Sequence, residues 1–463
     1  MNPIQKILAN YKKKKRIRQR KDAIRREKMG EKRWQMYVKR RRKRYLIAYG
    51  ARAACVLVVL LLVFSLGRGI GKLVHGKSEK SDEMTSAEET ASNQIVIGST
   101  GCMIMHQTIL DNYMDENGVC DFSDIFTYIS GTYSTPDFMT CEMEGALGEA
   151  GNYSGYPTLV GSDNMLDCLK NAGVDLQLIA TNHIYDDGEE GFQRTLDFYD
   201  SKEIAYEGAK NSESDTRYYI ADIGGIFVGF LDYEFSYTDK NGLAVVNNNT
   251  LTEEDTQRLN LFDVNDPTEM YEEVEQSIAE MKEQGVQFII TNLHWGDEYQ
   301  LEQNETQEAI AAKLCELGVD ALIGGHPHCE QPIDVIESED GSRQMFCIYS
   351  VGNSLSNQTA ERMESEMSGG YTEDGVVIDL TLTKDEDDTV SITGVDAIPT
   401  WCYKEVLNAD TDEARFYILP LDDVENLEET TGLTGIEEEA KESYERTMSV
   451  IGEGLEKAQS VFQ

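Results

Sequence analysis

Three segments share a pattern that restricts the fold more than any other feature of this sequence. Each has a helix with apolar residues every three or four positions, then a glycine, a short apolar strand and a histidine. The segments are "NMLDCLKNAGVDLQLIATNH" at 164–183, "EMYEEVEQSIAEMKEQGVQFIITNLH" at 269–294 and "EAIAAKLCELGVDALIGGHPH" at 308–328. Alternating helices and strands favour a largely parallel sheet, in which the carboxyl ends of the strands lie along one edge. We therefore expect the histidines to meet there.

The spacing between glycine and histidine is similar in the three segments, at ten, nine and eight residues. Taken singly, a histidine at a strand end usually just bonds a nearby carbonyl, and "GGHPH" could be only a turn fixed by Pro327. The chain has six histidines in all, and four of them follow this pattern: His183, His294, His326 and His328. Four together favour a shared site over four separate structural roles.

Neutral imidazoles gathered at a sheet edge suit Zn, Fe, Mn or a similar divalent metal ion, and a hydrolytic site also needs carboxylate or amide oxygen. Asn182 stands beside His183. A fourth apolar strand, "DFMTCEMEG", carries Glu142 and Glu144 two residues apart, so both face the same side. A solvated strand edge is the alternative interpretation of Glu142. The sequence thus predicts a divalent metal cofactor.

Charge divides the chain into two parts. The first 50 residues hold 20 of the 42 Lys and Arg but only 3 of the 84 Asp and Glu, so the remainder is strongly acidic. Between the parts lies "YLIAYGARAACVLVVLLLVFSLG", residues 45–67, which is long and apolar enough to cross most of a bilayer. A secretory signal peptide would have a shorter basic region, and a buried core helix would not call for a basic flank on one side only. We expect an uncleaved single-pass anchor with the basic arm in the cytoplasm and the main domain outside.

The basic arm contains "KKKKRIRQRK" and "KRRRKR", which could attract any phosphate backbone. Next to a membrane span, anionic lipid headgroups are the nearer partner, so we expect lipid and not nucleic acid to bind there. The nine cysteines follow no regular spacing, and disulfides are therefore permitted but not specified.

Composition and periodicity predict five regions. These are a basic cytoplasmic arm at 1–44, the anchor at 45–67, a polar linker at 68–93, an α/β domain at 94–418 and an acidic helical tail at 419–463. Near the end of the α/β domain, "DGVVIDLTLT" and "TVSITGV" alternate apolar and polar residues, which indicates added antiparallel strands.

Several blocks between about residues 94 and 375 resemble the CapA proteins, also called poly-γ-glutamate capsule biosynthesis proteins. Their domain is similar to the calcineurin-like metallophosphoesterases. The matching blocks are "GYP" at 155–157, "ATNHIYDDGEEG" at 180–191, "LHWGDEY" at 293–299, "GVDALIGGHPHCEQP" at 318–332 and "IYSVGNS" at 348–354. The resemblance implies an αββα sandwich with mixed, largely parallel sheets. It also implies a metal site held by Asn182, His294, His326 and His328.

The chain departs from the family where members have a strand ending in Gly-Asp. Here "IGSTGCMIMHQ" puts Cys102 in the place of the bridging aspartate. Glu142 could supply the lost charge, Cys102 could ligate a soft metal as a thiolate, or the site could be degenerate.

Two functions remain open. A metal-dependent hydrolase would use Glu144 to assist and His183 to protonate the leaving group. A non-catalytic module would hold or guide an envelope polymer, or the machinery that makes it.

Overall fold

The computed structural model describes residues 93–212 and 215–462. The predicted anchor at 45–67 and the basic arm lie outside these residues, as does the linker up to residue 92. Within the described part, no helix is both long and apolar enough to cross a bilayer.

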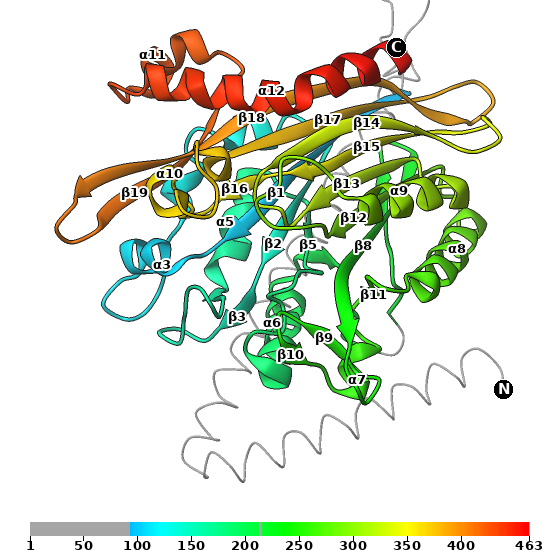
Figure 1. Ribbon diagram of the computed structural model, residues 1–463, viewed down its shortest axis with the longest axis horizontal. Helices are drawn as coiled ribbons and strands as arrows, with labels where there is room; N and C mark the ends of the chain where they lie inside the picture. The colour runs from blue at the N-terminus through cyan, green and yellow to red at the C-terminus, as the bar shows by residue number, and fades with distance from the viewer. Residues whose placement is uncertain (1–92, 213–214, 463) are drawn as a thin grey trace, which may run out of the picture. The chain divides into compact units, whose positions relative to one another are not determined.

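An 8-stranded sheet, sheet one, contains the strand that opens the folded unit (Figure 1). Its central strands are parallel, and β17 and β18, formed by the two alternating segments, add to it antiparallel as expected. The strand order is β19 (Glu413–Pro420), β18 (Val390–Asn408), β17 (Asp374–Lys384), β1 (Gln94–Ile104), β2 (Phe138–Glu144), β5 (Leu176–Leu178) and β6 (Ala205–Glu207), with β16 (Asn353–Leu355) also paired to β1.

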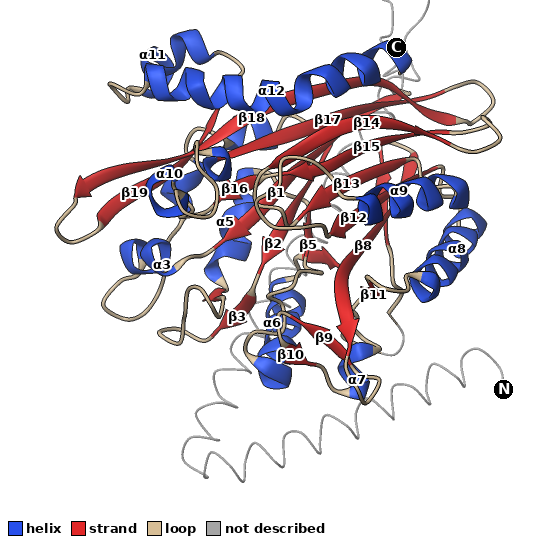
Figure 2. Cartoon of the chain, in the orientation of Figure 1, coloured by secondary structure: helices blue, strands red, loops and turns tan. Residues whose placement is uncertain are grey.

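A 9-stranded sheet, sheet two, carries the strands of the second and third histidine segments (Figure 2). Its order is β10 (Asn249–Thr250), β9 (Ala244–Val246), β8 (Ile226–Thr238), β12 (Phe288–His294), β13 (Ala321–Gly325), β15 (Gln344–Val351) and β14 (Glu330–Glu337), with β7 (Tyr219–Ile223) and β11 (Leu261–Asp263) paired to β8. Strands β8, β12, β13 and β15 run parallel, as the helix–strand alternation predicts. A separate pair consists of β3 (Ala146–Gly148) and β4 (Val160–Ser162).

The helices complete the layers. They are α3 (Gln107–Tyr113), α4 (Ser130–Tyr133), α5 (Asn164–Ala172), α6 (Gly188–Lys202), α7 (Glu253–Thr256), α8 (Thr268–Glu283), α9 (Glu305–Leu317), α10 (Ala360–Met363), α11 (Leu427–Thr431) and α12 (Glu437–Val461), with short 3-10 turns η1 (Ser123–Phe126), η2 (Tyr371–Glu373) and η3 (Val424–Asn426). Apolar side chains of α5 and α6 pack on the outer face of sheet one. Those of α8 and α9 pack on the outer face of sheet two.

A core to which both sheets contribute lies between them. Ile97 and Leu176 of sheet one pack there with Phe230, Ile290 and Ile323 of sheet two. Burial of apolar area on both faces of each sheet stabilises this mixed α/β arrangement, at about 25 cal/mol per Å² removed from water. Parallel and antiparallel strands in two facing sheets agree with the predicted α/β sandwich.

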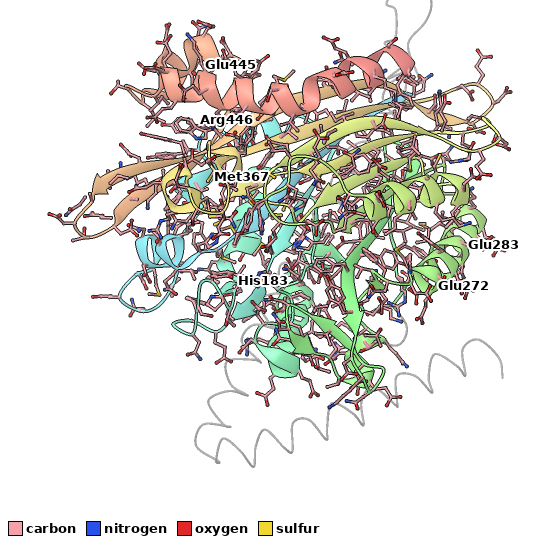
Figure 3. All side chains as sticks on the ribbon, in the orientation of Figure 1. His183, Glu272, Glu283, Met367, Glu445 and Arg446 are labelled. Carbon is pink, nitrogen blue, oxygen red and sulfur yellow. The ribbon has the colours of Figure 1, made fainter. Side chains whose placement is uncertain are left out.

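The C-terminal helix α12 packs against β14 of one sheet and β17 and β18 of the other. Its apolar residues Ile451 and Leu455 enter the core between the sheets. Polar contacts add to this packing: Arg446 donates two hydrogen bonds to buried Asp374, at 2.6 and 2.8 Å, and Thr447 Oγ1 donates to Glu330 Oε1 at 2.7 Å. Figure 3 shows Arg446 on the side of α12 that faces the strands and Glu445 on the opposite side.

Candidate metal centre

Strand ends bring the predicted site residues to one edge of the two facing sheets. Glu144 ends β2, His294 ends β12, and His326 directly follows β13. In the first segment the strand β5 ends earlier, at Leu178, and a short loop leads to His183. These residues come from both sheets and converge, as expected for the carboxyl ends of parallel strands.

Cys102 lies inside β1, opposite Glu142 of the neighbouring strand β2. The register shifts between Thr100 and Cys102, so a bulge interrupts the pairing there. Bulges of this kind turn a side chain out of the regular alternation and occur often beside functional sites.

A first group of potential ligands consists of Cys102, Glu142 and His294, whose ligand atoms all lie within 4.8 Å of one another. The Cys102 thiol donates a hydrogen bond to Glu142 Oε2 at 3.1 Å. The other carboxylate oxygen of Glu142 bonds His294 Nδ1. All three side chains are buried.

Asn182 and His326 extend the first group on the far side of the His294 ring. Asn182 Oδ1 and His326 Nδ1 each lie 3.1 Å from His294 Nε2. When His294 Nδ1–H donates to Glu142, Nε2 carries a lone pair that faces another acceptor, Asn182 Oδ1. A cation between His294 Nε2, Asn182 Oδ1 and His326 Nδ1 would accept a lone pair from each of these three atoms.

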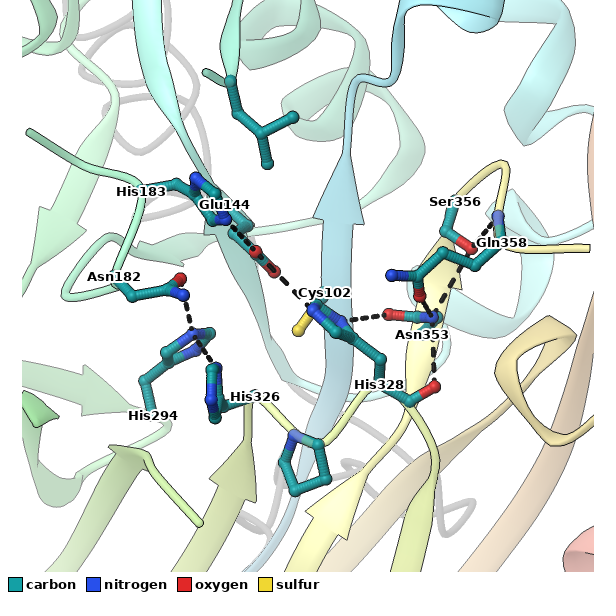
Figure 4. Close-up of polar contacts among 12 residues, drawn as sticks. Cys102, Glu144, Asn182, His183, His294, His326, His328, Asn353, Ser356 and Gln358 are labelled. Carbon is teal, nitrogen blue, oxygen red and sulfur yellow. Dashed lines mark hydrogen bonds and ion pairs between the residues drawn. The ribbon is translucent and has the colours of Figure 1, made fainter. Parts of the chain in front are cut away.

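A second group consists of Cys102, Glu144 and His328, again with ligand atoms within 4.8 Å. Glu144 Oε1 lies 4.0 Å from His328 Nε2 and 3.8 Å from His183 Nε2. Neither oxygen of this buried carboxylate has a hydrogen-bond partner among the described residues. Cys102 belongs to both groups, and Figure 4 shows it between the Asn182–His294–His326 side chains and Asn353.

His183 is held by an acidic partner that the sequence analysis did not single out. Its Nδ1 lies 2.6 Å from Asp186 Oδ2, and Asn247 Nδ2 donates to Asp186 Oδ1 at 2.9 Å. With Nδ1–H donating to the carboxylate, Nε2 is directed toward Glu144. Burial alone would lower the pKa of His183, but the hydrogen bond to Asp186 and the charge of Glu144 outweigh it and raise that pKa.

Asn353 orients His328 in a similar way. His328 Nδ1 donates to Asn353 Oδ1 at 3.2 Å, while Asn353 Nδ2 donates to the His328 carbonyl and to Gln358 Oε1. This arrangement fixes the tautomer and leaves His328 Nε2 free to face Glu144. A fifth histidine, His106, accepts a hydrogen bond from the Asn357 backbone N–H at 3.1 Å. Burial and the nearby His328 and His183 lower the pKa of His106 to about 3.

Burial dominates the protonation states of this centre when no cation is bound. It raises the pKa of Glu142 to about 7 and also raises that of Glu144. Burial, followed by the charges of Glu142 and Glu144, raises the pKa of the Cys102 thiol well above its ordinary value. Burial lowers the pKa of His294 and His326 well below the ordinary range. A divalent ion would reverse this balance for the acids, because a coordinated thiol or carboxyl loses its proton.

The donor set fits a divalent metal. It combines neutral imidazoles, two carboxylates and a thiol, and the unpartnered oxygens of Glu144 are free for coordination. The structure brings together all eight residues named from the sequence: Cys102, Glu142, Glu144, Asn182, His183, His294, His326 and His328.

Sequence reasoning missed Asp186, Asn353 and His106. The first two stand within the blocks "NHIYDD" and "IYSVGNS", and the three-residue step from His183 to Asp186 was a usable signal. His106 follows Cys102 by four residues, but only the turn after β1 brings it near the other histidines.

Comparisons with known proteins agree on one family. A family model described as "Bacterial capsule synthesis protein PGA_cap" matches residues 96–358, more than half of the chain. The Capsule biosynthesis protein CapA of Bacillus anthracis is 26% identical over 201 residues, which are 43% of this chain and 44% of that protein. The PGA biosynthesis protein CapA of Bacillus subtilis (strain 168) is 22% identical over 346 residues, which are 73% of this chain and 80% of that protein. The match thus spans less than half the length of the first relative and most of the second.

Proposed function

Because the chain belongs to the bacterial capsule synthesis protein family PGA_cap, we propose that it acts in the synthesis or export of a capsule or envelope polymer of the poly-γ-glutamate type. We further propose that it does so through a metal-dependent hydrolase-like site of the metallophosphoesterase kind. One observation carries this second step. Two groups of buried potential ligands share Cys102, and a shared ligand of this kind is what a site for two neighbouring ions would use.

Each residue then has a defined task. Asn182, His294 and His326 would hold one ion, with Glu142 hydrogen-bonded to the opposite ring nitrogen of His294. Glu144 and His328 would hold the other, and Cys102, as a thiolate, would be a ligand common to the two groups. When bound, such ions polarise the bond to be broken. His183, oriented by Asp186 at 2.6 Å, would hold the proton that is delivered to the leaving group.

Metal content tests the site directly. We expect the purified full chain to contain a divalent metal, measured by mass spectrometry after mild dialysis. We expect His326→Ala combined with His328→Ala to lower that content by at least half, because each substitution removes a ligand from a different group. Zn, Fe or Mn is the expected ion, since imidazole and thiolate ligands disfavour Mg.

Glu207→Gln is the matched control for the histidine variant. Glu207 is buried, as the two histidines are, but it lies outside both ligand groups. Its carboxylate accepts a hydrogen bond from Asn260 Nδ2 at 3.1 Å. If the double histidine variant kept the metal content of the control, the named residues would hold nothing. A screen of phosphodiester and peptide substrates with the same samples separates the two functions. Metal with turnover supports a hydrolase, and metal without turnover supports an assembly module.

The assembly module is the second candidate, and the charge of the chain bears on it. Acidic residues dominate the sequence after residue 50, so direct contact with a polyanion is electrostatically unfavourable. Such a module would need bridging cations or a partner protein to hold poly-γ-glutamate. Binding of a polyglutamate oligomer that depends on added divalent cation, with no cleavage, would favour this role.

We also propose that residues 45–67 anchor the protein in the cell membrane as a single span, with the basic arm in the cytoplasm, against anionic lipid, and the main domain outside. The support is the basic flank on one side of the apolar run. Protease added to intact cells should then cleave the main domain and spare the basic arm. The reverse pattern would contradict this orientation.

A further inference from the structure

Strand β8 carries two acids on the face that points between the sheets. Val228 and Phe230 of this strand belong to the core between the sheets, while Leu231 and Tyr233 face the outer helices. Side chains alternate along a strand, so Glu234 lies on the inner side with Phe230. The parallel pairing of β8 with β12 places Glu234 directly opposite His294. Glu234 is thus the cross-strand neighbour of a residue in the first ligand group.

Among the described residues, the carboxyl group of Glu234 has no hydrogen-bond partner. The residue is 0% exposed, and neither of its oxygens accepts or donates a hydrogen bond among the described residues. The nearby inner-face acid Asp232 is satisfied instead by the Ala180 backbone N–H at 2.9 Å. In the described part of the chain, Glu144 is the only other carboxyl whose two oxygens are both buried and unpartnered, and it belongs to the second ligand group.

An unpartnered buried carboxyl is costly, and more so when it is charged. The groups around Glu234 increase this cost. Burial, followed by the charges of Glu142 and Glu144, raises its pKa well above the ordinary value. A bound cation beside His294 would convert this unfavourable arrangement into a favourable one.

The chain also lacks one carboxylate that the family resemblance implies, because Cys102 stands in its place. We propose that Glu234 is a third carboxylate of the metal centre, acting with the first group of Cys102, Glu142 and His294. This inference rests on the metal site of the proposed function and deepens it. Glu234 would supply negative charge and a hard oxygen to the ion beside His294, and thereby strengthen the binding of Mn or Fe at that position.

The test compares the full chain with Glu234→Gln, an isosteric change, and with Glu207→Gln as the matched buried-acid control. Each protein is stripped with a chelator and titrated with Mn²⁺ and with Zn²⁺. Bound metal per chain, dissociation constant and thermal unfolding midpoint are then measured. We expect Glu234→Gln to weaken binding of one ion by about 10–100-fold, with the larger effect for Mn²⁺, and to reduce the rise in midpoint that the metal causes.

The metal-free proteins give a second, independent readout. Because Glu234→Gln removes an unpartnered acid without changing its shape, the metal-free variant should unfold at the same temperature as the parent or a higher one. If the Glu234 carboxyl instead stabilised the metal-free fold, the metal-free variant would unfold at a lower temperature than the parent. Parental affinity for both ions in Glu234→Gln would overturn the inference, as would a lowered midpoint of the metal-free variant. If the parent chain itself bound no metal, the inference and the proposed metal site would both fall.

Discussion

The two histidines of "GGHPH" have an unusual backbone conformation. His326 has φ of 93° and His328 has φ of 59°, both in the left-handed region that favours glycine. Such a residue costs on the order of 1–3 kcal/mol and persists only when its surroundings hold it in place. Gly325 allows this turn to approach the site, since a Cβ there would lie 2.0 Å from Glu142 Oε2. Two imidazoles kept in strained positions are consistent with a ligand role.

In the proposed metal site, Cys102 would determine which divalent ion binds more tightly. A thiolate shared by both groups favours Zn or Fe, whereas a carboxylate favours Mn or Mg. We expect Cys102→Asp to shift the preference toward Mn by about tenfold relative to Zn, measured by competition of the two ions for the metal-free protein. Cys141→Ser, a change at a buried cysteine of β2 outside both groups, is the control. An unchanged ratio in the Cys102 variant would mean that the thiol does not contact the ion.

The eight residues predicted from the sequence lie close together in the structure, because each belongs to a strand of the sheets or to a block that follows one. Glu234 could not be identified in this way. Its strand reads as an ordinary buried segment, and only the pairing of β8 with β12 places it beside His294. Asp186 and Asn353 were missed because they act through histidines, and a sequence does not record which hydrogen bond orients a ring.

At the scale of elements, helix starts were harder to predict than strand ends. The segment after Asp266 suggests a capping box with Pro267 at the first position and Glu269 reaching back. In the structure α8 begins at Thr268, whose N–H bonds Asp266 Oδ1 at 3.3 Å, and no capping bond from Glu269 is formed within the described residues. A complete capping box instead starts α9, between Asn304 and Gln307. Local patterns locate helices well, but tertiary packing decides which cap forms.

Helix α12 contains two glycines that differ in their surroundings. A Cβ at Gly454 would lie 1.8 Å from the Ile333 carbonyl oxygen of β14, while one at Gly452 would meet only the end of Met448 at 3.6 Å. We expect Gly454→Ala to lower the free energy of unfolding by about 1–3 kcal/mol, because the helix must move away from the strand. Gly452→Ala should raise it by about 0.5–1 kcal/mol through better helix propensity. Urea unfolding of both variants measures this, and equal effects would show that α12 does not pack closely on β14.

At the scale of the whole molecule, a buried acid makes the stability depend on pH. Burial raises the pKa of Glu207 to about 8, although the Gly208 backbone N–H and Asn260 oppose this shift. The folded chain therefore binds this proton more tightly than the unfolded chain. As a consequence, the contribution of Glu207 to the free energy of unfolding falls as the pH rises from about 4.5 to 8. One pKa unit corresponds to about 1.4 kcal/mol, so the change is large enough to measure.

Glu207→Gln tests this assignment. In the metal-free protein, we expect the variant to lose less stability than the parent between pH 5 and pH 8, because the titrating group is gone. Urea unfolding at the two pH values gives both differences. Parallel losses in parent and variant would place the pH dependence elsewhere in this acidic chain.

The contact between α12 and β14 also bears on the order in which the protein is made. Thr447 and its partner Glu330 are 117 residues apart, and Glu330 follows His328 by only two residues. At ordinary rates of synthesis, the histidine turn leaves the ribosome on the order of ten seconds before the helix that braces it. During that interval the proposed metal ligands have all been synthesised, but α12, which contacts Glu330 beside the histidine turn, has not. We therefore expect metal loading to follow docking of α12, so that ion capture becomes a late step in the maturation of the nascent chain.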